Sequence, residues 1–194
     1  MQLRSSSKLV RIVALALLST VSLVLFLISF PLPFLPPYLK VDFSEIPALI
    51  ATLVFSPLAG VIVIFIKNVL YFIITGATDP VGVVANFIAG TIFILPVALL
   101  YNKYRSLASV VTGLVIGTVA MTLAMGILNY VVVLPTYALL MGWEMDATAK
   151  LVAVYAGILP FNAIKGIFIG IIFVPVFIKL EQWVRQRQVR FASS

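Results

Sequence analysis

The chain contains six apolar stretches that are as long, or nearly as long, as a helix that crosses a lipid bilayer. They cover approximately residues 9–30, 44–56, 58–75, 81–101, 107–135 and 152–178. A crossing helix needs roughly 20 residues, and the stretches lack the alternation typical of strands. Only 10% of the residues are charged, against about 25% in soluble chains. The sequence therefore predicts an all-α membrane protein, a six-transmembrane-helix bundle that forms one polytopic domain over residues 1–194.

The second and third stretches meet at residues 56–60, so they form either a tight hairpin or one kinked helix. Basic residues decide between these, because they gather on the cytoplasmic side of membrane proteins. A hairpin leaves only Lys40 and Lys150 outside, whereas one kinked helix would place the loop with Lys103 and Arg105 outside. We therefore expect the hairpin, with both termini cytoplasmic. The nine basic residues then inside are Arg4, Lys8, Arg11, Lys103, Arg105, Lys179, Arg185, Arg187 and Arg190.

Residue types that the sequence lacks exclude several classes of chemistry. Cysteine and histidine are absent, which removes disulfides, thiolate nucleophiles, imidazole bases and nearly all zinc or haem sites. The phosphate-binding loop of nucleotide-hydrolysing domains is also absent, so any ATP must be handled by another chain. The net charge of +7 follows the ends of the apolar stretches and forms no basic groove. We expect no enzyme activity, no metal, no cofactor and no nucleic acid partner.

Polar side chains inside two apolar stretches indicate a binding site within the membrane. A lysine near the centre of a crossing helix costs roughly 2.5–3.5 kcal/mol, so Lys165 is expected to face a cavity or a partner. Asn162 lies three residues earlier on the same helix face, and Pro160 bends this segment. Asn129, late in the fifth stretch, is expected at a similar depth. Carboxamides suit a neutral planar heterocycle with imide and carbonyl groups, and the alternative is hydrogen bonding between helices.

Two further polar positions inside the stretches favour structural roles at least as strongly as ligand binding. Lys67, in the third stretch, is expected to pair with a carboxylate or a carbonyl group. Asn86, in the fourth stretch, either hydrogen-bonds a neighbouring helix or contacts a ligand. Neither position alone predicts a binding site.

Carboxylates precede two of the stretches at positions typical of helix caps. Asp42 lies three residues before Glu45, and Asp79 directly precedes Pro80. We expect capping as their main role, with Asp79 and Gly82 as further candidates for lining a pocket. The alternative is that the three carboxylates form the metal-dependent centre of a membrane enzyme acting on a lipid or isoprenoid. The scarcity of nucleophiles and bases argues against it.

The segment between the first two stretches holds four prolines within residues 31–40. Proline fixes the backbone and lacks the N–H that a helix needs, so this segment is predicted to be stiff and extended. It is too apolar for a solvated linker. We expect a lid or wall over a pocket on the outer side, with a simple connector pressed onto the bundle as the alternative.

Small residues recur along the first stretch and permit close approach of another helix. Packing inside the bundle and docking of a membrane partner explain them equally well. The candidates for docking are Ala14, Ala16, Ser19 and Thr20.

Five motifs give the chain a family resemblance: FPLPFLPPYL at 30–39, DFSEIP at 42–47, DPVG at 79–82, LNY at 128–130 and PFNAIKG at 160–166. Through them, residues 10–180 resemble the riboflavin-specific substrate-binding subunit (S component) of energy-coupling-factor (ECF) vitamin transporters. The resemblance implies a six-helix membrane bundle that captures riboflavin at the outer face, with the proline-rich segment as a lid. Sister subunits for thiamine, biotin, folate and niacin share this fold, so another vitamin is the alternative ligand.

The resemblance also implies site residues and partners. The expected substrate-binding residues are Leu39, Val41, Phe43, Asp79, Gly82, Asn129, Asn162 and Lys165, with Asn86 added from its place in the fourth stretch. The expected partners are a transmembrane coupling subunit (T component) and two ABC-type ATPases, in the cell membrane. Family members often dock the coupling subunit through two alanines four residues apart, whereas here Ala16 is followed by Thr20. The site is expected toward the extracellular side.

Overall fold

The computed structural model describes residues 2–142 and 144–192, and it describes the side chains of residues 8–142 and 144–182. Four of the basic residues expected on the cytoplasmic side have side chains outside this set: Arg4, Arg185, Arg187 and Arg190. The described elements are α1 (Gln2–Leu27), β1 (Phe30–Pro31), β2 (Lys40–Val41), α2 (Glu45–Val54), α3 (Pro57–Ile74), α4 (Pro80–Tyr104), α5 (Leu107–Leu128), the π-helix η1 (Asn129–Val133), α6 (Leu134–Met141), α7 (Ala147–Val152), the π-helix η2 (Ala153–Ile158) and α8 (Leu159–Ala192).

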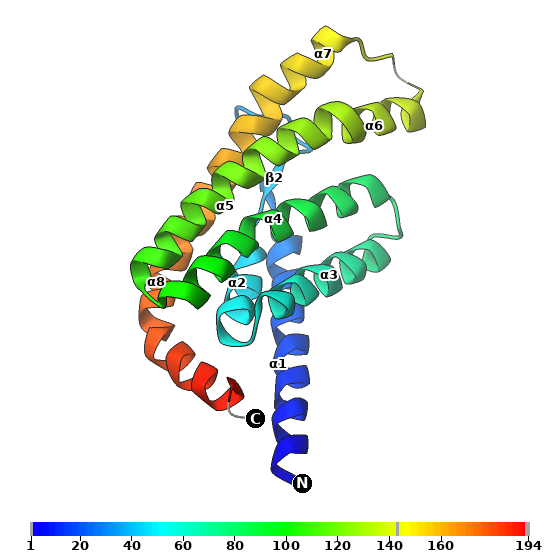
Figure 1. Cartoon of the computed structure of the whole chain (residues 1–194). Coiled ribbons are helices and arrows are strands. Elements are labelled where there is room, and N and C mark those ends of the chain that lie inside the picture. The colour runs from blue at the N-terminus through cyan, green and yellow to red at the C-terminus, as the bar shows by residue number, and fades with distance from the viewer. Residues whose placement is uncertain (1, 143, 193–194) are drawn as a thin grey trace.

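The helices form a bundle (Figure 1), and five of the described segments are long and apolar enough to cross a membrane. They are α1, α3, α4, the continuous run α5–η1–α6 and the continuous run α7–η2–α8. The sixth, α2, has 10 residues and is therefore about 15 Å long. The predicted all-α membrane bundle of six helices is confirmed, although α2 is shorter than a full crossing.

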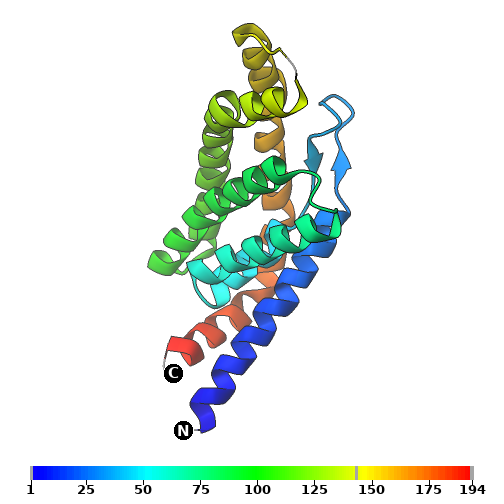
Figure 2. The same cartoon turned by 90° about the vertical axis from the view of Figure 1, so that its right-hand side faces the viewer.

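The second and third apolar stretches form the hairpin that the charge pattern favoured. α2 ends at Val54, and α3 begins at Pro57, a favoured residue for the first helical turn. Ser56 caps α3 by accepting a hydrogen bond from the Ala59 N–H at 3.2 Å. The two helices pack against each other, and α3 also packs against α1 and α4. Figures 1 and 2 show both chain ends at one end of the bundle, as expected for six crossings.

The last two crossings run past the boundaries that the sequence predicted. The fifth stretch was predicted to end at Pro135 and the sixth to span 152–178, whereas the helical runs extend from Leu107 to Met141 and from Ala147 to Ala192. In each run a π-helical segment ends two residues before a proline, Pro135 or Pro160. The π-turn shifts the hydrogen-bond register at the position where the proline cannot donate, so the helix continues.

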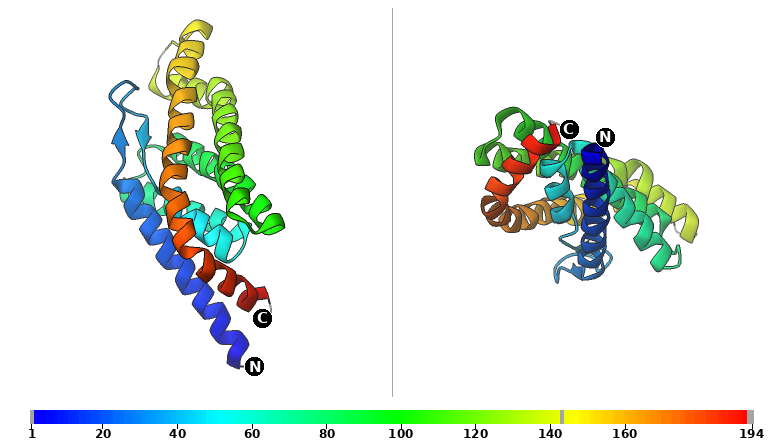
Figure 3. Two further views of the ribbon diagram at one scale, coloured as in Figure 1. Left: turned by 90° about the vertical axis from the view of Figure 1, so that its left-hand side faces the viewer. Right: turned by 90° about the horizontal axis from the view of Figure 1, so that it is seen from below.

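The proline-rich segment is a narrow hairpin built on two short antiparallel strands. Phe30 lies opposite Val41, and Pro31 lies opposite Lys40. Figure 3 shows this hairpin beside α8, toward the end of the bundle that is opposite the termini. The prediction of an extended segment is wrong for residues 32–39, where hydrogen bonds from the Leu35 N–H to the Leu32 carbonyl group and from the Leu39 N–H to that of Pro36 close two turns.

Close packing of α4 against α5 depends on two glycines. A methyl group added at Gly113 would overlap the backbone of Val97, and one added at Gly117 would overlap the carbonyl group of Phe93. Small residues at such contacts let helix backbones approach closely in membranes. Among the described helices, α4 and α5 therefore pack against each other most extensively.

Candidate functional site

Four charged side chains meet inside the bundle, where the base of the β1–β2 hairpin reaches α2, α3 and α8. Lys165 Nζ lies 2.9 Å from Asp42 Oδ2 and 3.0 Å from Glu45 Oε1. Glu45 Oε1 also lies 3.8 Å from Lys67 Nζ. These four residues, which we call the charge cluster, are all buried, with exposures of 4% or less. Two carboxylates balance two ammonium groups, and this mutual pairing offsets part of the cost of burial.

Neighbouring polar groups hold the charge cluster on its α3 side. Lys67 Nζ donates to Ser44 Oγ at 2.8 Å and to Asn86 Oδ1 at 2.7 Å, and it lies 4.3 Å from the centre of the Phe26 ring. The Ser44 carbonyl group in turn accepts a hydrogen bond from Ser22 Oγ at 2.6 Å. The predicted pairing of Lys67 is confirmed. Of the two alternatives for Asn86, the structure shows the hydrogen bond between helices.

The two carboxylates of the charge cluster differ from the predicted capping pair. Asp42 Oδ1 accepts a hydrogen bond from the Ser44 N–H at 2.9 Å, so Asp42 does shape the start of α2. Glu45 stands in the first turn, but its carboxylate is directed at Lys165, so the predicted capping-box role of Glu45 is wrong. Burial alone would raise the pKa of the Asp42 carboxyl, but the ammonium groups of Lys165 and Lys67 hold it below its usual range.

The two asparagines of the predicted site each donate to their own helix. Asn162 Nδ2 donates to the carbonyl group of Ile158, and Asn129 Nδ2 donates to that of Met125, both at 2.8 Å. Asn129 is the first residue of η1, and Ile158 is the last residue of η2. Both amides therefore lie beside π-helical segments, which are frequent at functional sites. Among the described residues, Lys165 bonds to neither asparagine.

The apolar residues of the predicted site come from the base of the hairpin. Val41 is fully buried in a small cluster with Leu32 and Leu35, and Phe161 and Ile164 of α8 pack against that cluster. In the sequence, Phe161 directly precedes Asn162, and Ile164 directly precedes Lys165. The hairpin is thus attached to the same turn of α8 by apolar packing and by ion pairs.

The other two hairpin residues lie on either side of Val41. Phe43 is half-buried, packs against the main core, and has its ring centre 6.2 Å from that of Phe30. Leu39 is half-buried and lies next to Gly157 of η2. The hairpin therefore faces η2 as well as α8.

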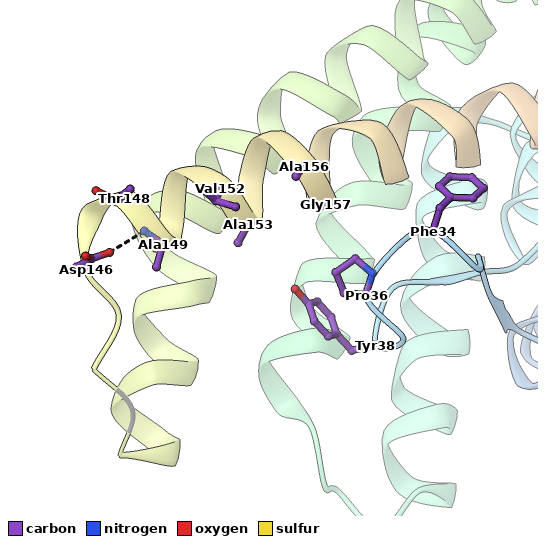
Figure 4. Close-up of a pocket in the computed structure, with 10 residues that line it drawn as sticks. All are labelled: Phe34, Pro36, Tyr38, Asp146, Thr148, Ala149, Val152, Ala153, Ala156 and Gly157. Atoms are coloured by element: carbon purple, nitrogen blue, oxygen red, sulfur yellow. Dashed lines mark hydrogen bonds between the residues drawn. The ribbon is translucent and has the colours of Figure 1, made fainter.

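An open cleft of about 670 Å³ lies between the tip of the hairpin and the helical run α7–η2 (Figure 4). None of the predicted substrate-binding residues lines it, but Gly157 at one edge adjoins Leu39. The cleft therefore reaches the edge of the predicted site. It is lined by Phe34, Pro36, Tyr38, Asp146, Thr148, Ala149, Val152, Ala153, Ala156 and Gly157.

Asp79 caps α4, as the sequence predicted. Its Oδ1 accepts a hydrogen bond from the Gly82 N–H at 2.8 Å and a second from the Tyr137 hydroxyl of α6 at 2.6 Å. A methyl group added at Gly82 would overlap the Asp79 carboxylate. The contact from Tyr137 was not predicted, because no local pattern relates two residues 58 positions apart. It ties the start of α4 to α6.

The predicted docking residues on α1 do not share one exposed face. Ala16 and Thr20 are exposed, and Ala14 is half-buried. Ser19 is 1% exposed and donates to the carbonyl group of Leu15. Ser19 therefore faces the bundle, and the structure corrects its assignment to a docking surface.

The carboxylates offer no metal centre of the kind that a membrane enzyme would need. Asp42 and Glu45 are engaged by lysines, and Asp79 is engaged by a helix start and a tyrosine. Within the described ranges, no group of three or more carboxylates could hold a metal ion. This arrangement gives no support to the alternative of a lipid-modifying enzyme.

Comparison with known proteins identifies the family. A family model described as "ECF transporter, substrate-specific component" matches residues 10–177. The riboflavin transporter FmnP of Bacillus subtilis is 51% identical over 184 residues, which cover 93% of this chain and 97% of FmnP. The riboflavin transporter RibU of Staphylococcus aureus is 43% identical, over 91% of this chain and 93% of RibU.

A solved structure agrees with these sequence relatives. Described as "Structure and mechanism of the S component of a bacterial ECF transporter", it matches with a TM-score of 0.79 and 42% sequence identity, over 91% of this chain and 98% of that chain. Fold and sequence thus point to one family across almost the whole chain. The chain belongs to the substrate-specific components of ECF transporters.

Proposed function

We propose that this chain is a riboflavin-binding S component that mediates riboflavin uptake as part of an ATP-driven ECF transporter. Both sequence relatives described above are named riboflavin transporters, and each alignment covers more than nine-tenths of both chains. This favours riboflavin over thiamine, biotin, folate or niacin as the ligand. Since the family consists of transporter components, the chain is a transport protein and not an enzyme. Riboflavin is its cargo, and no cofactor is implied.

The attachment of the hairpin to α8 is the observation that carries the proposed binding site. The ion pairs of Lys165 and the packing of Val41 bring the hairpin base against the helix turn that also carries Asn162. Leu39, Val41 and Phe43 would pack against the ring system of riboflavin. The amide of Asn162 and the ammonium group of Lys165 would bond to its imide and carbonyl groups.

The remaining predicted residues have supporting roles in this proposal. Asn129, at the start of η1, is the third hydrogen-bonding group, and Asp79 and Gly82 are contacts near the start of α4. Asn86 would act indirectly, by holding Lys67, because its side-chain oxygen accepts a hydrogen bond from Lys67. The cleft beside the hairpin tip is the proposed route to the site, and movement of the hairpin toward η2 would close it as a lid.

The partners in the proposal are a transmembrane coupling subunit and two ABC-type ATPases. The sequence has no phosphate-binding loop of its own. The exposed apolar side of α1 that carries Ala16 and Thr20, with Ala14 at its edge, is the proposed docking surface. Energy from ATP hydrolysis by the partners would reorient this subunit and release riboflavin into the cell.

The proposed orientation places both termini in the cytoplasm and the hairpin toward the extracellular side. Nine basic residues at the cytoplasmic side against two outside support it. The whole chain acts as one membrane unit, because the charge cluster draws its residues from both the first and the last thirds of the sequence.

Uptake of labelled riboflavin tests this function. Cells unable to make or import riboflavin should accumulate the label when they express this chain together with the coupling subunit and the ATPases. Cells that express only the partner subunits are the control. Excess unlabelled riboflavin should abolish the uptake, and excess thiamine or biotin should leave it unchanged. Competition by one of the other vitamins, without competition by riboflavin, would assign a different ligand.

A further inference from the structure

Lys165 has more carboxylate partners than neutralising its charge requires. Asp42 Oδ2, 2.9 Å from Lys165 Nζ, already balances the charge of this lysine. Glu45 Oε1 nevertheless lies 3.0 Å from the same ammonium group, and Glu45 is 1% exposed. A second buried carboxylate is costly unless its own charge is paired and hydrogen-bonded. Glu45 supplies the charge that balances Lys67, yet it lies closer to Lys165 than to Lys67.

Glu45 connects the two lysines of the charge cluster through one oxygen atom. Its Oε1 lies 3.0 Å from Lys165 Nζ and 3.8 Å from Lys67 Nζ. Lys67 is itself held by Ser44 Oγ and Asn86 Oδ1. Lys67 has a fixed position on α3. Through Glu45 it therefore restrains the position of the Lys165 ammonium group on α8.

The other carboxylate oxygen of Glu45 makes no contribution to this pairing. Glu45 Oε2 is buried, and it has no hydrogen-bond partner among the described residues. Two-point binding of a single ammonium group would use both oxygens, and a pair built for stability alone would leave neither unsatisfied. The arrangement instead directs one oxygen at a point between two ammonium groups.

A fixed ammonium group differs from a free one in the cost of ligand binding. The lysine side chain is a flexible four-carbon stem, and ordering it at the moment of binding reduces affinity. A lysine already held in its bound position avoids that cost. A residue that fixes the orientation of Lys165 therefore increases the affinity of the protein for its ligand.

We propose that Glu45 is a positioning residue, which holds the Lys165 ammonium group in its substrate-binding place by bridging it to Lys67 and does not itself contact the substrate. This proposal rests on the riboflavin site proposed above, because it requires Lys165 to bind the ligand. Asp42 neutralises Lys165, and Glu45 sets its direction.

A double-mutant cycle on riboflavin affinity tests the proposal. Four purified proteins are titrated: the parent, Glu45→Gln, Lys165→Met and the double variant. Each single substitution should raise the Kd at least about tenfold, since each removes a charged hydrogen bond. In the Lys165→Met background, Glu45→Gln should add no more than about a twofold change, because its effect passes through Lys165. Glu144→Gln, the same substitution at an exposed glutamate, should leave the Kd unchanged.

A merely structural role for Glu45 predicts a different pattern. The loss of affinity caused by Glu45→Gln would then be similar in the parent and in the Lys165→Met background. Additive losses would therefore overturn the proposal, as would an unchanged Kd for Glu45→Gln. If Lys165→Met binds riboflavin as the parent does, the proposed site and this inference both fail, and if the parent binds no riboflavin, the proposed function fails as well.

A charge-balanced variant keeps the test decisive if Glu45→Gln does not fold. Glu45→Gln combined with Lys67→Met removes one carboxylate and one ammonium group, which leaves the Asp42–Lys165 pair intact and neutral. This variant should fold and should bind riboflavin at least about tenfold more weakly than the parent. Parental affinity in this variant would overturn the proposal.

Discussion

At the scale of single residues, the charge cluster determines how acid acts on the protein. Burial alone would raise the pKa of the Asp42 carboxyl, but Lys165 and Lys67 hold it below its usual range. A carboxyl whose pKa is depressed by folding contributes stability that is complete above its unfolded pKa, about 3.9 for aspartate. This contribution is lost as the pH falls through the folded value. The charge cluster should therefore be intact at neutral pH and weaken only in strong acid.

The lowered pKa of Asp42 gives the first prediction. The melting temperature in detergent should stay constant between about pH 8 and about pH 5 and should fall below about pH 4. Asp42→Asn should melt at a lower temperature at neutral pH and should lose part of the acid dependence. Asp146→Asn, at the exposed N-cap of α7, is the control and should keep the dependence of the parent. The same acid dependence in Asp42→Asn as in the parent would contradict the account.

A second prediction concerns Asp79, which serves two partners at once. Asp79→Ala removes the cap of α4 and the acceptor of the Tyr137 hydroxyl, so it should reduce the free energy of unfolding by about 1–2 kcal/mol. Asp79→Asn keeps an oxygen for the cap and should lose less. Tyr137→Phe removes only the contact to α6 and should likewise lose less. Denaturant unfolding in detergent measures all three, and an unaffected Asp79→Ala protein would refute the double role.

Single residues also mark how far the sequence could predict the site. The burial cost of a lysine in a crossing helix predicted that Lys67 and Lys165 need partners, and both have them. It could not predict which partners, because Lys165 and Asp42 lie 123 positions apart. The local spacing of Asp42 and Glu45 indicated a helix cap. That interpretation gave no sign that both carboxylates pair with the distant Lys165. Local patterns report on backbone geometry, whereas ion pairs depend on the fold.

At the scale of elements, glycine contacts decide how tightly the helices pack. Gly117 of α5 lies against the carbonyl group of Phe93 in α4, and a backbone atom cannot move aside as a side chain can. Gly170 of α8, in contrast, has open space where a methyl group would be added. The two positions therefore provide a matched comparison within one bundle.

The third prediction follows from that comparison. Gly117→Ala should reduce the free energy of unfolding by about 1–3 kcal/mol, the usual cost of overpacking. Gly170→Ala should leave the protein as stable as the parent or slightly more stable, because alanine is the better helix former. Unfolding curves of the two variants measure the difference. Equal stability of Gly117→Ala and Gly170→Ala would contradict the packing assigned to α4 and α5.

Elements also show where prediction of helix boundaries fails. Pro135 and Pro160 were expected to end or bend helices, since proline lacks a backbone donor. Each of η1 and η2 ends two residues before one of these prolines, and both helical runs continue. A π-helical segment has no recognisable pattern in a single sequence, so the additional lengths of α6 and α7 could not be predicted.

At the scale of the whole molecule, charge predicted the hairpin of α2 and α3 better than hydrophobic length did. α2 has only 10 residues and would be rejected by length alone. The distribution of basic residues nevertheless requires a hairpin there, and the structure contains it. Membrane orientation depends on the same distribution, so it can be tested independently of the fold.

The fourth prediction is the orientation itself. The chain has no cysteine, so single introduced cysteines report without background. Thr148→Cys, at the end of the bundle that carries the hairpin, should react with a membrane-impermeant maleimide added to intact cells. Lys103→Cys, at the end of α4, should react only after the membrane is opened. The opposite labelling pattern would invert the proposed topology.

Equilibrium titration of the purified, flavin-free protein with riboflavin tests whether the chain binds riboflavin through the turn of α8 that carries Asn162. The decisive pair is Asn162→Ala and Asn68→Ala, because both asparagines are buried and each donates to the carbonyl group four residues earlier, at 2.8 and 2.9 Å. We predict saturable binding by the parent and by Asn68→Ala, and a Kd at least about tenfold higher for Asn162→Ala. Absence of binding by the parent, or equal affinity in all three proteins, would contradict this prediction.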